Sequence, residues 1–310
     1  MNIDFNSAYD KYIAYLSLKL KPTTLLNIKR ALNKHVLTKI GNMCIYNYTC
    51  DDYFSWQNYI KNLGFSNSFN SNIQIIFTNF FDYLESFFSV ENIPKKYGKF
   101  KSYNVNENKQ NKDVWTIKDF RKFIKHVDDI TYNALFTLLF FTGLRKGEAL
   151  ALRFKDIDNK YISINKTITK EVFNNKHLEM TPKSKKSIRK IRIDRKLKNK
   201  LNKLCKYYIK KYNNFNSNFY VFGANKPISC TTLKRKKDYY CDIAHVKRIR
   251  IHDFRHSHAT LLYQKNIKVK VIQERLGHAS IDTTLNTYVH LNTEDEKKVL
   301  KVLNFLNLHL

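Results

Sequence analysis

Four short stretches of the chain carry residue types suited to chemistry on a phosphodiester. They are TGLRKGE at 142–148, HDFRH at 252–256, LGHAS at 276–280 and TTLNTYVH at 283–290. A phosphoryl group in transfer carries extra negative charge, which two guanidiniums can neutralise through bidentate hydrogen bonds at any working pH. Arg145 and Arg255 are suited to that task. The hydroxyl of Tyr288 could attack the phosphorus, and the resulting phosphotyrosine would keep the bond energy for the reverse step.

Proton transfer in such a reaction needs further groups. An exposed lysine at a hairpin tip can protonate the leaving 5′-hydroxyl, and Lys183 is the candidate, although the neighbouring Lys185 and Lys186 leave the choice open. The imidazoles of His252 and His278 could assist proton transfer or contact the phosphate. No acidic cluster of the kind that holds Mg²⁺ stands out, which disfavours a two-metal nuclease. We therefore expect no metal, cofactor or nucleotide.

The charge balance indicates a polyanionic partner. The 310 residues include 56 Lys+Arg against 26 Asp+Glu, a formal net charge of +30. Nucleic acid is the first candidate partner for such an excess. A compositional bias toward Lys, Asn and Ile, as an AT-rich genome produces, accounts for part of the charge. The charge alone is therefore a moderate argument for nucleic-acid binding.

The cysteines and the apolar segments indicate a soluble cytoplasmic protein. Five cysteines are scattered without a C-x-x-C pair, which predicts neither a disulfide framework nor a zinc site and fits a reducing compartment. The N-terminus lacks the basic and apolar regions of a signal peptide. The most apolar run, residues 134–141, is too short to cross a bilayer. No membrane association is expected.

Apolar periodicity predicts a small helical domain over residues 1–90. Its helices are expected over residues 5–18, after Pro22 with Thr23 or Thr24 as N-cap, over 51–63 and over 68–88. Gly64 is expected to end the third helix. One face of the fourth helix is expected to carry Phe69, Ile73, Ile76, Phe80 and Leu84.

A linker and a second, larger domain are expected after that. Residues 91–113 contain many Lys and Asn with little apolar periodicity, which indicates either a linker crossing a DNA backbone or an ordinary solvated linker. Helices should resume at Thr116, whose spacing to Asp119 resembles a capping box. Strands are expected at 161–168 and 188–193, with 181–186 as a hairpin tip. The catalytic domain is assigned to 114–310 and is mostly helical from residue 196.

The order Arg145, Lys183, His252-x-x-Arg255, His278, Tyr288 resembles the tyrosine recombinase, or phage-type integrase, family. The four stretches match that family's motifs, and the ten-residue step from His278 to Tyr288 fits as well. The resemblance covers residues 114–290 through motifs and the N-terminal helices through architecture alone. It implies a mainly α fold with a small antiparallel β-sheet. A SAM-like core-binding domain, a bundle of four helices, and an α+β catalytic domain would form a C-shaped clamp on DNA.

The resemblance also implies a role for each residue. Arg145 and Arg255 would hold the scissile phosphate, and Lys183 would occupy the place of the family's hairpin lysine, a general acid. His252 and His278 would support proton transfer and phosphate contacts. Tyr288 would become linked to a 3′-phosphate. Glu148 is expected to orient its surroundings, because its i,i+3 spacing permits contact with Arg145.

Partners are implied by the same resemblance. Double-stranded DNA is the substrate, a homotetramer on paired recombination sites is the expected assembly, and accessory DNA-bending or directionality factors belong to such systems. The amphipathic segment 294–308 could pack on its own domain, or dock on a neighbouring protomer as in the family, which we favour. Basic runs at 234–237 and 247–250 either contact DNA phosphates or form a solvated face.

Several alternatives remain open from the sequence. A type IB topoisomerase would use the same residue types, but the spacing from His278 to Tyr288 favours a recombinase. A non-catalytic DNA-binding accessory protein is the alternative from another class. Among recombinases, HDFRHSHAT at 252–260 resembles mobile-element integrases and favours integration and excision. The chain begins almost at once with the first helix, so an arm-binding domain is not expected. That leaves Xer-like chromosome-dimer resolution or DNA inversion as alternatives.

Overall fold

The computed structural model describes residues 3–99, 114–170, 177–180 and 187–277. The chain divides into two compact units, which we call unit 1 (the described residues up to 99) and unit 2 (the described residues from 114). Several predicted features lie outside the described residues. They are residues 100–113 of the linker, the hairpin tip with Lys183, Lys185 and Lys186, the residues His278 and Tyr288, and the amphipathic segment 294–308.

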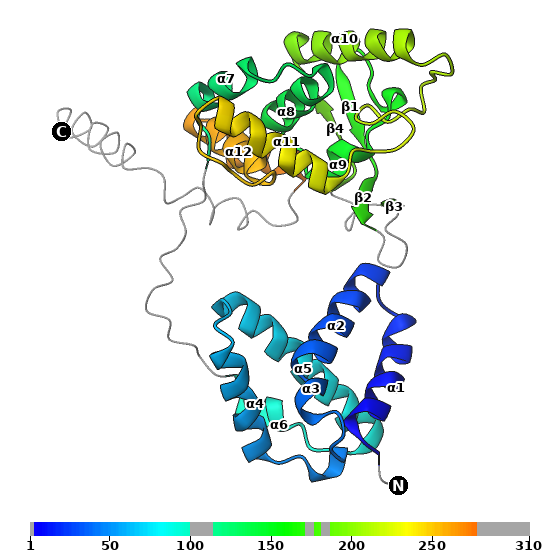
Figure 1. Cartoon of the computed structure of the whole chain (residues 1–310), viewed down its shortest axis with the longest axis vertical. Helices are drawn as coiled ribbons and strands as arrows, with labels where there is room; N and C mark the ends of the chain where they lie inside the picture. The colour runs from blue at the N-terminus through cyan, green and yellow to red at the C-terminus, as the bar shows by residue number, and fades with distance from the viewer. Residues whose placement is uncertain (1–2, 100–113, 171–176, 181–186, 278–310) are drawn as a thin grey trace, which may run out of the picture. The chain divides into compact units, whose positions relative to one another are not determined.

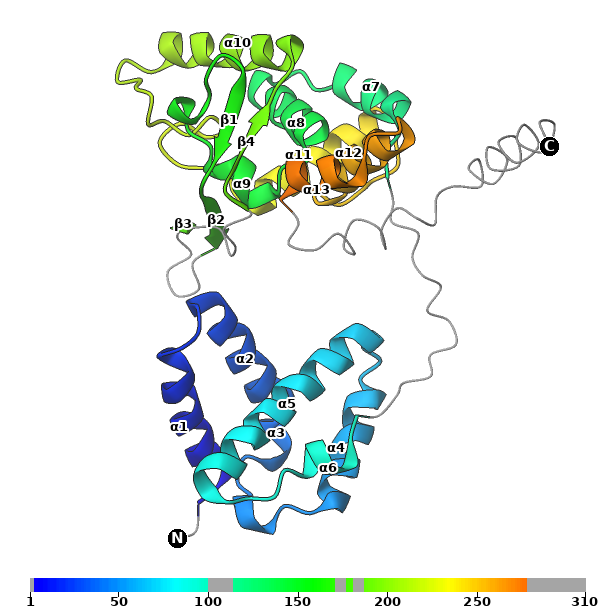
Figure 2. The same ribbon diagram turned by 180° about the vertical axis from the view of Figure 1, so that it is seen from behind.

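Unit 1 is helical over its described residues (Figures 1 and 2). Its elements are α1 (Phe5–Ser17), α2 (Pro22–His35), α3 (Leu37–Ile40), the 3₁₀ turn η1 (Ile45–Asn47), α4 (Cys50–Asn62), α5 (Asn67–Phe88) and α6 (Ile93–Tyr97). The long helix α5 contacts α1, α2 and α6. The four longer helices lie where the apolar periodicity predicts them.

Aromatic side chains dominate the core of unit 1. Phe5, Tyr53, Phe77 and Phe81 are fully buried, and the rings of Trp56 and Phe77 lie 4.4 Å apart. Burying one such side chain contributes about 2–3 kcal/mol through the apolar area removed from water. Offset and edge-to-face ring pairs add a smaller, orientation-dependent contribution. A chain with 14% aromatic residues can therefore stabilise a small helical unit.

Two details of unit 1 differ from the sequence prediction. Helix α2 begins at Pro22 with Lys21 as N-cap, so Thr23 and Thr24 lie inside the first turn. Proline is tolerated there because the first helical N–H has no partner within the helix. Phe69, on the apolar face predicted for the fourth helix, is 41% exposed, unlike the buried Ile73 and Phe80 of that face. It packs edge-on against the rings of His35 and Phe65.

The described part of the predicted linker contains a short helix. Ile93 and Pro94 in α6 are buried, and Asn92 caps the helix by accepting a hydrogen bond from the N–H of Lys95. The carbonyl of Gly98 accepts hydrogen bonds from Tyr53 and Gln57 of α4. The start of the range 91–113 therefore packs on unit 1.

Unit 2 combines helices with two small antiparallel sheets (Figures 1 and 2). Its elements are α7 (Ile117–Lys125), α8 (Ile130–Thr142), α9 (Lys146–Ala151), the 3₁₀ turn η2 (Phe154–Asp156), β1 (Tyr161–Ile164), β2 (Thr167–Lys170), β3 (His177–Met180), β4 (Arg189–Arg192), α10 (Arg195–Lys211), α11 (Cys230–Ile243), α12 (Asp253–Gln264) and α13 (Val269–Leu276). The capping box predicted at Thr116 and Asp119 is present at the start of α7.

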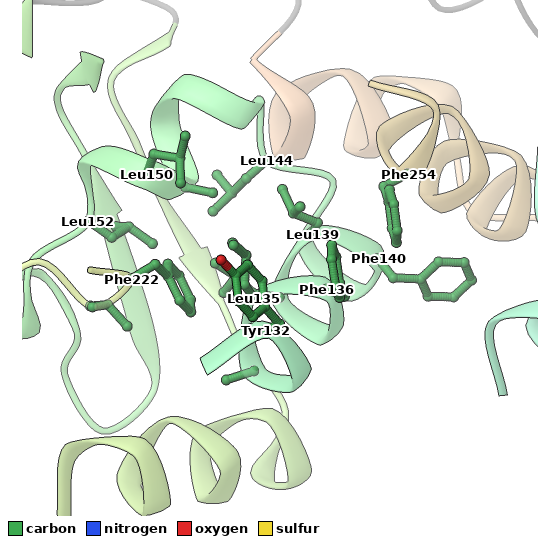
Figure 3. Close-up of a cluster of buried hydrophobic side chains, with 14 of the residues drawn as sticks. Tyr132, Leu135, Phe136, Leu139, Phe140, Leu144, Leu150, Leu152, Phe222 and Phe254 are labelled. Atoms are coloured by element: carbon green, nitrogen blue, oxygen red, sulfur yellow. The ribbon is translucent and has the colours of Figure 1, made fainter. Parts of the chain in front are cut away.

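Helix α8 is the central element of unit 2 and contacts α7, α9, α10 and α12. It is apolar on all sides, as expected of a helix surrounded by protein. Figure 3 shows Leu135, Phe136 and Leu139 of this helix within the buried cluster. Phe136 stacks on Phe254 of α12 with ring centroids 5.8 Å apart. The helix that carries HDFRH is thereby fixed against the helix that leads into TGLRKGE.

The strands form two separate pairs. β1 pairs with β4 so that Ile162 faces Ile191, and β2 pairs with β3 so that Thr167 faces Met180. The single strand predicted over residues 161–168 is therefore divided into β1 and β2 at residues 165–166. In the part of the chain that the structure describes, no helix is both long and apolar enough to span a membrane.

Candidate active site

The turn after α8 places Arg145 at the start of α9. Gly143 ends α8 in the left-handed region with φ of 66°. A Cβ at this glycine would lie 2.6 Å from Cδ2 of Leu276 and 2.7 Å from Cδ2 of His258. Both the backbone conformation and the lack of space therefore require glycine. This tight turn brings the end of α8 close to α12 and α13.

Glu148 holds Arg145 from one turn further along α9. Its carboxylate accepts hydrogen bonds from the backbone N–H and the Nη1 of Arg145, both at 2.9 Å. The contact that the i,i+3 spacing permits is therefore present. The Arg145 side chain is 37% exposed, whereas that of Glu148 is 3% exposed. The buried carboxylate can thus fix the direction of a guanidinium that still reaches the surface.

Arg255 lies near the start of α12 and is 2% exposed. Its Nη1 donates to the carbonyl of Gly143 at 2.9 Å and its Nη2 donates to the carbonyl of Leu276 at 2.8 Å. Arg145 donates through Nη2 to the next carbonyl along, that of Gly277, at 2.9 Å. The two arginines therefore converge on consecutive peptide groups at the end of α13.

His252 caps α12 next to these arginines, and its ring lies at the surface. Partial desolvation lowers the pKa of His252, and the positive charges of Arg255 and Arg145 lower it further. The ring packs edge-on against His256 with centroids 4.9 Å apart. A neutral imidazole beside two guanidiniums can accept a proton at neutral pH.

Three residues that the sequence analysis did not assign to the site complete its surroundings. Arg189 of β4 donates two hydrogen bonds to Glu148, Arg275 of α13 donates to Nε2 of His258, and His258 is 3% exposed. Burial raises the pKa of Glu148, but hydrogen bonds and charge from Arg189 and Arg145 bring it below its ordinary value. In a chain with 56 Lys+Arg, no local sequence signal distinguishes Arg189 and Arg275 from the other basic residues.

The structure brings together the described members of the predicted site, Arg145, His252 and Arg255. His278 follows directly after Gly277, whose carbonyl accepts from Arg145. Lys183, His278 and Tyr288 themselves lie outside the described residues. Among the residues placed in the structure, no group of three or more His, Cys, Asp or Glu side chains could hold a metal ion.

Basic residues in the runs 234–237 and 247–250 differ in exposure, and therefore in how readily they could contact DNA phosphates. Lys237 is 2% exposed and its Nζ pairs with Asp238 and the carbonyl of Ile249, so this lysine stabilises the fold. Arg248 forms an ion pair with Asp242 at 2.5 Å. An exposed pair of this kind contributes little stability and can rearrange on contact with phosphate.

Two family models match the chain. One described as "Phage integrase family" matches residues 113–295, and one described as "Phage integrase, N-terminal SAM-like domain" matches residues 4–61. The ICEBs1 integrase of Bacillus subtilis is 28% identical over 98% of this chain and 84% of its own length. A XerC-like tyrosine recombinase of Caldanaerobacter subterraneus is 30% identical over 63% of this chain and 54% of its own length.

Solved structures share the fold at low sequence identity. The Tn1549 transposon integrase in complex with transposon right end DNA has a TM-score of 0.79 at 19% identity, covering 97% of this chain and all of that chain. A lambda integrase tetramer bound to a Holliday junction has a TM-score of 0.68 at 16% identity, covering 93% of this chain and 78% of that one. Both share the fold of this chain, which is mainly helical with small antiparallel sheets, as the motifs led us to expect.

Proposed function

This chain belongs to the phage integrase family of tyrosine recombinases, DNA breaking and rejoining enzymes of mobile elements, and we propose that it cuts DNA with Tyr288 to integrate and excise such an element. The observation that carries the proposal is the convergence of Arg145 and Arg255 on consecutive carbonyls at the end of α13. That convergence lies one residue before His278 and eleven before Tyr288.

The proposed cleavage step uses Arg145, Arg255 and Tyr288. Arg145 and Arg255 neutralise the nonbridging oxygens of the scissile phosphate, where charge develops in the transition state. The Oη of Tyr288 attacks phosphorus, a bond forms between them, and the bond from phosphorus to the 5′-oxygen breaks. The product is a 3′-phosphotyrosine and a free 5′-hydroxyl. Rejoining is the same step in reverse, with the 5′-hydroxyl of a partner strand as the nucleophile.

Protons move through the remaining site residues. Lys183 donates a proton to the leaving 5′-oxygen as general acid. His252 and His278 accept the tyrosine proton or bind the phosphate oxygens. The lowered pKa of His252 keeps its ring neutral near pH 7, as a proton acceptor requires. Because the phosphotyrosine conserves the bond energy, the reaction needs no nucleotide or metal.

We also propose that the active assembly is a homotetramer on paired double-stranded sites. The lambda integrase in the solved structure described above is a tetramer bound to a Holliday junction, which supports this assembly by similarity of fold. The domain division proposed is a core-binding domain over 1–90, a linker over 91–113 and a catalytic domain over 114–310. Segment 294–308 would dock on the neighbouring protomer.

The test of function is covalent capture on DNA. The protein is incubated in EDTA with nicked suicide duplexes from the junctions of its own element, and the products are separated on denaturing gels. We expect a protein–DNA adduct in the wild type that is absent in Tyr288→Phe. Tight, salt-sensitive binding without an adduct on any duplex would favour a non-catalytic DNA-binding protein. Adducts only on duplexes resembling chromosome-dimer sites would favour a resolution enzyme.

A further inference from the structure

Two arginines join strand β4 to helix α13 in both directions. Arg189 of β4 donates from Nε to the carbonyl of Arg275 in α13 at 2.8 Å. Arg275 in turn donates from Nη1 to the carbonyl of Arg192 in β4 at 3.2 Å. Each side chain thus bonds the backbone of the other's element. The two elements cannot slide past each other without breaking both hydrogen bonds.

Arg189 also sets the charge around Arg145. Its Nη1 and Nη2 donate to the two carboxylate oxygens of Glu148 at 3.1 and 3.0 Å, and its side chain is 8% exposed. The group formed by Arg145, Glu148 and Arg189 therefore contains two guanidiniums and one carboxylate, with a net charge of +1. Without Arg189, Glu148 and Arg145 would form a neutral pair, and a neutral pair attracts a phosphate less strongly.

Arg275 fixes the end of α13 from the other side. Its Nε donates to Nε2 of His258 at 3.1 Å, and its Nη2 donates to the carbonyl of Phe141 at 3.1 Å. Nδ1 of His258 lies 2.9 Å from the carbonyl of Phe140, so the ring donates there and accepts from Arg275. The ends of α8 and α13 are held together through these contacts.

We propose that Arg189 and Arg275 form a reciprocal lock that positions Arg145 through Glu148 and holds strand β4 against helix α13. The lock rests on the proposed function, because it positions the residues assigned there. Arg189 and Arg275 are positioning residues and touch no reacting atom. Lys183 lies six residues before Arg189, and His278 lies three residues after Arg275.

Loss of Arg189 has a chemical consequence that a purely structural residue would not produce. The charged groups that face Glu148 are Arg145 at the start of α9 and Arg189 of β4. Burial raises the pKa of Glu148 and Arg189 lowers it, so the pKa of Glu148 rises when Arg189 is removed. A protonated Glu148 no longer accepts two hydrogen bonds from Arg145. Activity should therefore fall with acidification at a higher pH than in the wild type.

The test compares single-turnover rates of adduct formation on a suicide duplex at saturating protein. The variants are Arg189→Gln, Arg189→Lys and Arg275→Lys. The matched control is Lys190→Gln, which removes one positive charge from an exposed side chain of the same strand. We expect Arg189→Gln to be slower by about 100-fold, because small misplacements of catalytic groups cost that much. Its DNA affinity should match that of the control, since each lacks one charge.

The pH profile separates positioning from folding. Arg189→Gln should lose activity on the acid side at a higher pH than the wild type, whereas the double variant with Glu148→Gln should lack that shift. Arg189→Lys and Arg275→Lys keep the positive charge, so they can replace Arg189→Gln in the test if that variant does not fold. Both should form the adduct more slowly than the wild type, with unchanged DNA affinity. Rates equal to that of Lys190→Gln in all three variants would overturn the lock. A wild type that forms no adduct would overturn the proposed function and the lock with it.

Discussion

The two units of this protein bury different kinds of polar side chains. Among the described residues, the buried polar side chains of unit 1 are a histidine and four amides, whereas unit 2 buries full charges. The charged set in unit 2 comprises Glu148, Asp156, Lys237, Asp253 and Arg255. Burying a charge is costly unless it is paired, and apolar replacements are often as stable. Stability alone therefore does not explain the difference.

The location of the charges gives a better explanation. Glu148 and Arg255 surround the turn at Gly143 and the end of α13, where Arg145 also donates. A phosphate in transfer needs fixed positive charge that does not have to reorganise. In unit 2, Glu148 orients the guanidiniums of Arg145 and Arg189. In unit 1, the neutral amides of Gln57 and Asn70 donate to backbone carbonyls. We therefore propose that the catalytic chemistry takes place in unit 2.

The largest effect is expected from Arg255. Replacing it with Gln removes the guanidinium that we propose binds the phosphate, so adduct formation should fall about 10³-fold, as for other arginines that stabilise phosphoryl transfer. The rate of adduct formation at saturating protein measures this. Gln57→Met serves as the unit 1 control, because it removes a buried hydrogen bond to Gly98 and should leave that rate unchanged. Equal losses in both variants would remove the distinction between the units.

Two glycines with nearly the same backbone conformation provide the next comparison. Gly143→Ala should destabilise unit 2 by about 3 kcal/mol, from the left-handed backbone and from overpacking against His258 and Leu276. Gly64 has φ of 67°, but no atom lies within 4 Å of a Cβ added there. Gly64→Ala should therefore destabilise unit 1 by only about 1 kcal/mol. Urea unfolding, with hydrogen exchange as the readout in each unit, measures the cost of each substitution. Similar costs would show that the turn at Gly143 is not tightly packed.

Acidification should destabilise unit 2 through His258. Burial and the charge of Arg275 lower its pKa to about 3, so the folded ring stays neutral while the unfolded ring takes up a proton below pH 6.5. The stabilising contribution of neutral His258 should be fully present above the pKa of the unfolded ring. As the pH falls from 7 to 5, the free energy of unfolding should decrease by about 2 kcal/mol. Unfolding curves at both pH values measure this. The variant His258→Gln should lose that part of the pH dependence; an unchanged slope would contradict the assignment.

The smallest effects should be the same in both units. Thr49 and Asp52 form a capping box on α4, and Thr116 and Asp119 form one on α7. Each Thr→Ala replacement should cost about 1 kcal/mol of local stability, because a helix N-terminus needs the same hydrogen bonds in either unit. Hydrogen exchange of the first turn of each helix provides the readout. A much larger cost at Thr116 would indicate that α7 also supports the site.

The sequence predicted the main helices of unit 1 and the helices before Arg145, because apolar periodicity and caps are local signals. It misplaced the start of α2, where Pro22 itself is the first helical residue, and it joined β1 and β2 into one strand. It placed Phe69 on one apolar face with Ile73 and Phe80, but the packing of α5 leaves Phe69 partly exposed. These errors concern contacts that local pattern does not encode.

In the candidate site, too, some residues could be predicted from the sequence and others only from the fold. Motif order was enough to nominate Arg145, His252 and Arg255, which the structure brings together. Arg189 and Arg275 could not be nominated, because an arginine in a basic chain has many roles and only the fold brings these two onto Glu148 and His258. The proposed roles of Lys183, His278 and Tyr288 remain predictions from the motifs.

The central claim is that unit 2 fixes a phosphate for attack by Tyr288, and the direct measurement is to identify the residue joined to DNA. The adduct formed in EDTA is digested with nuclease and protease and analysed by tandem mass spectrometry. The account predicts a nucleotide linked through its 3′-phosphate to Tyr288. Linkage to another tyrosine, or through a 5′-phosphate, would contradict it.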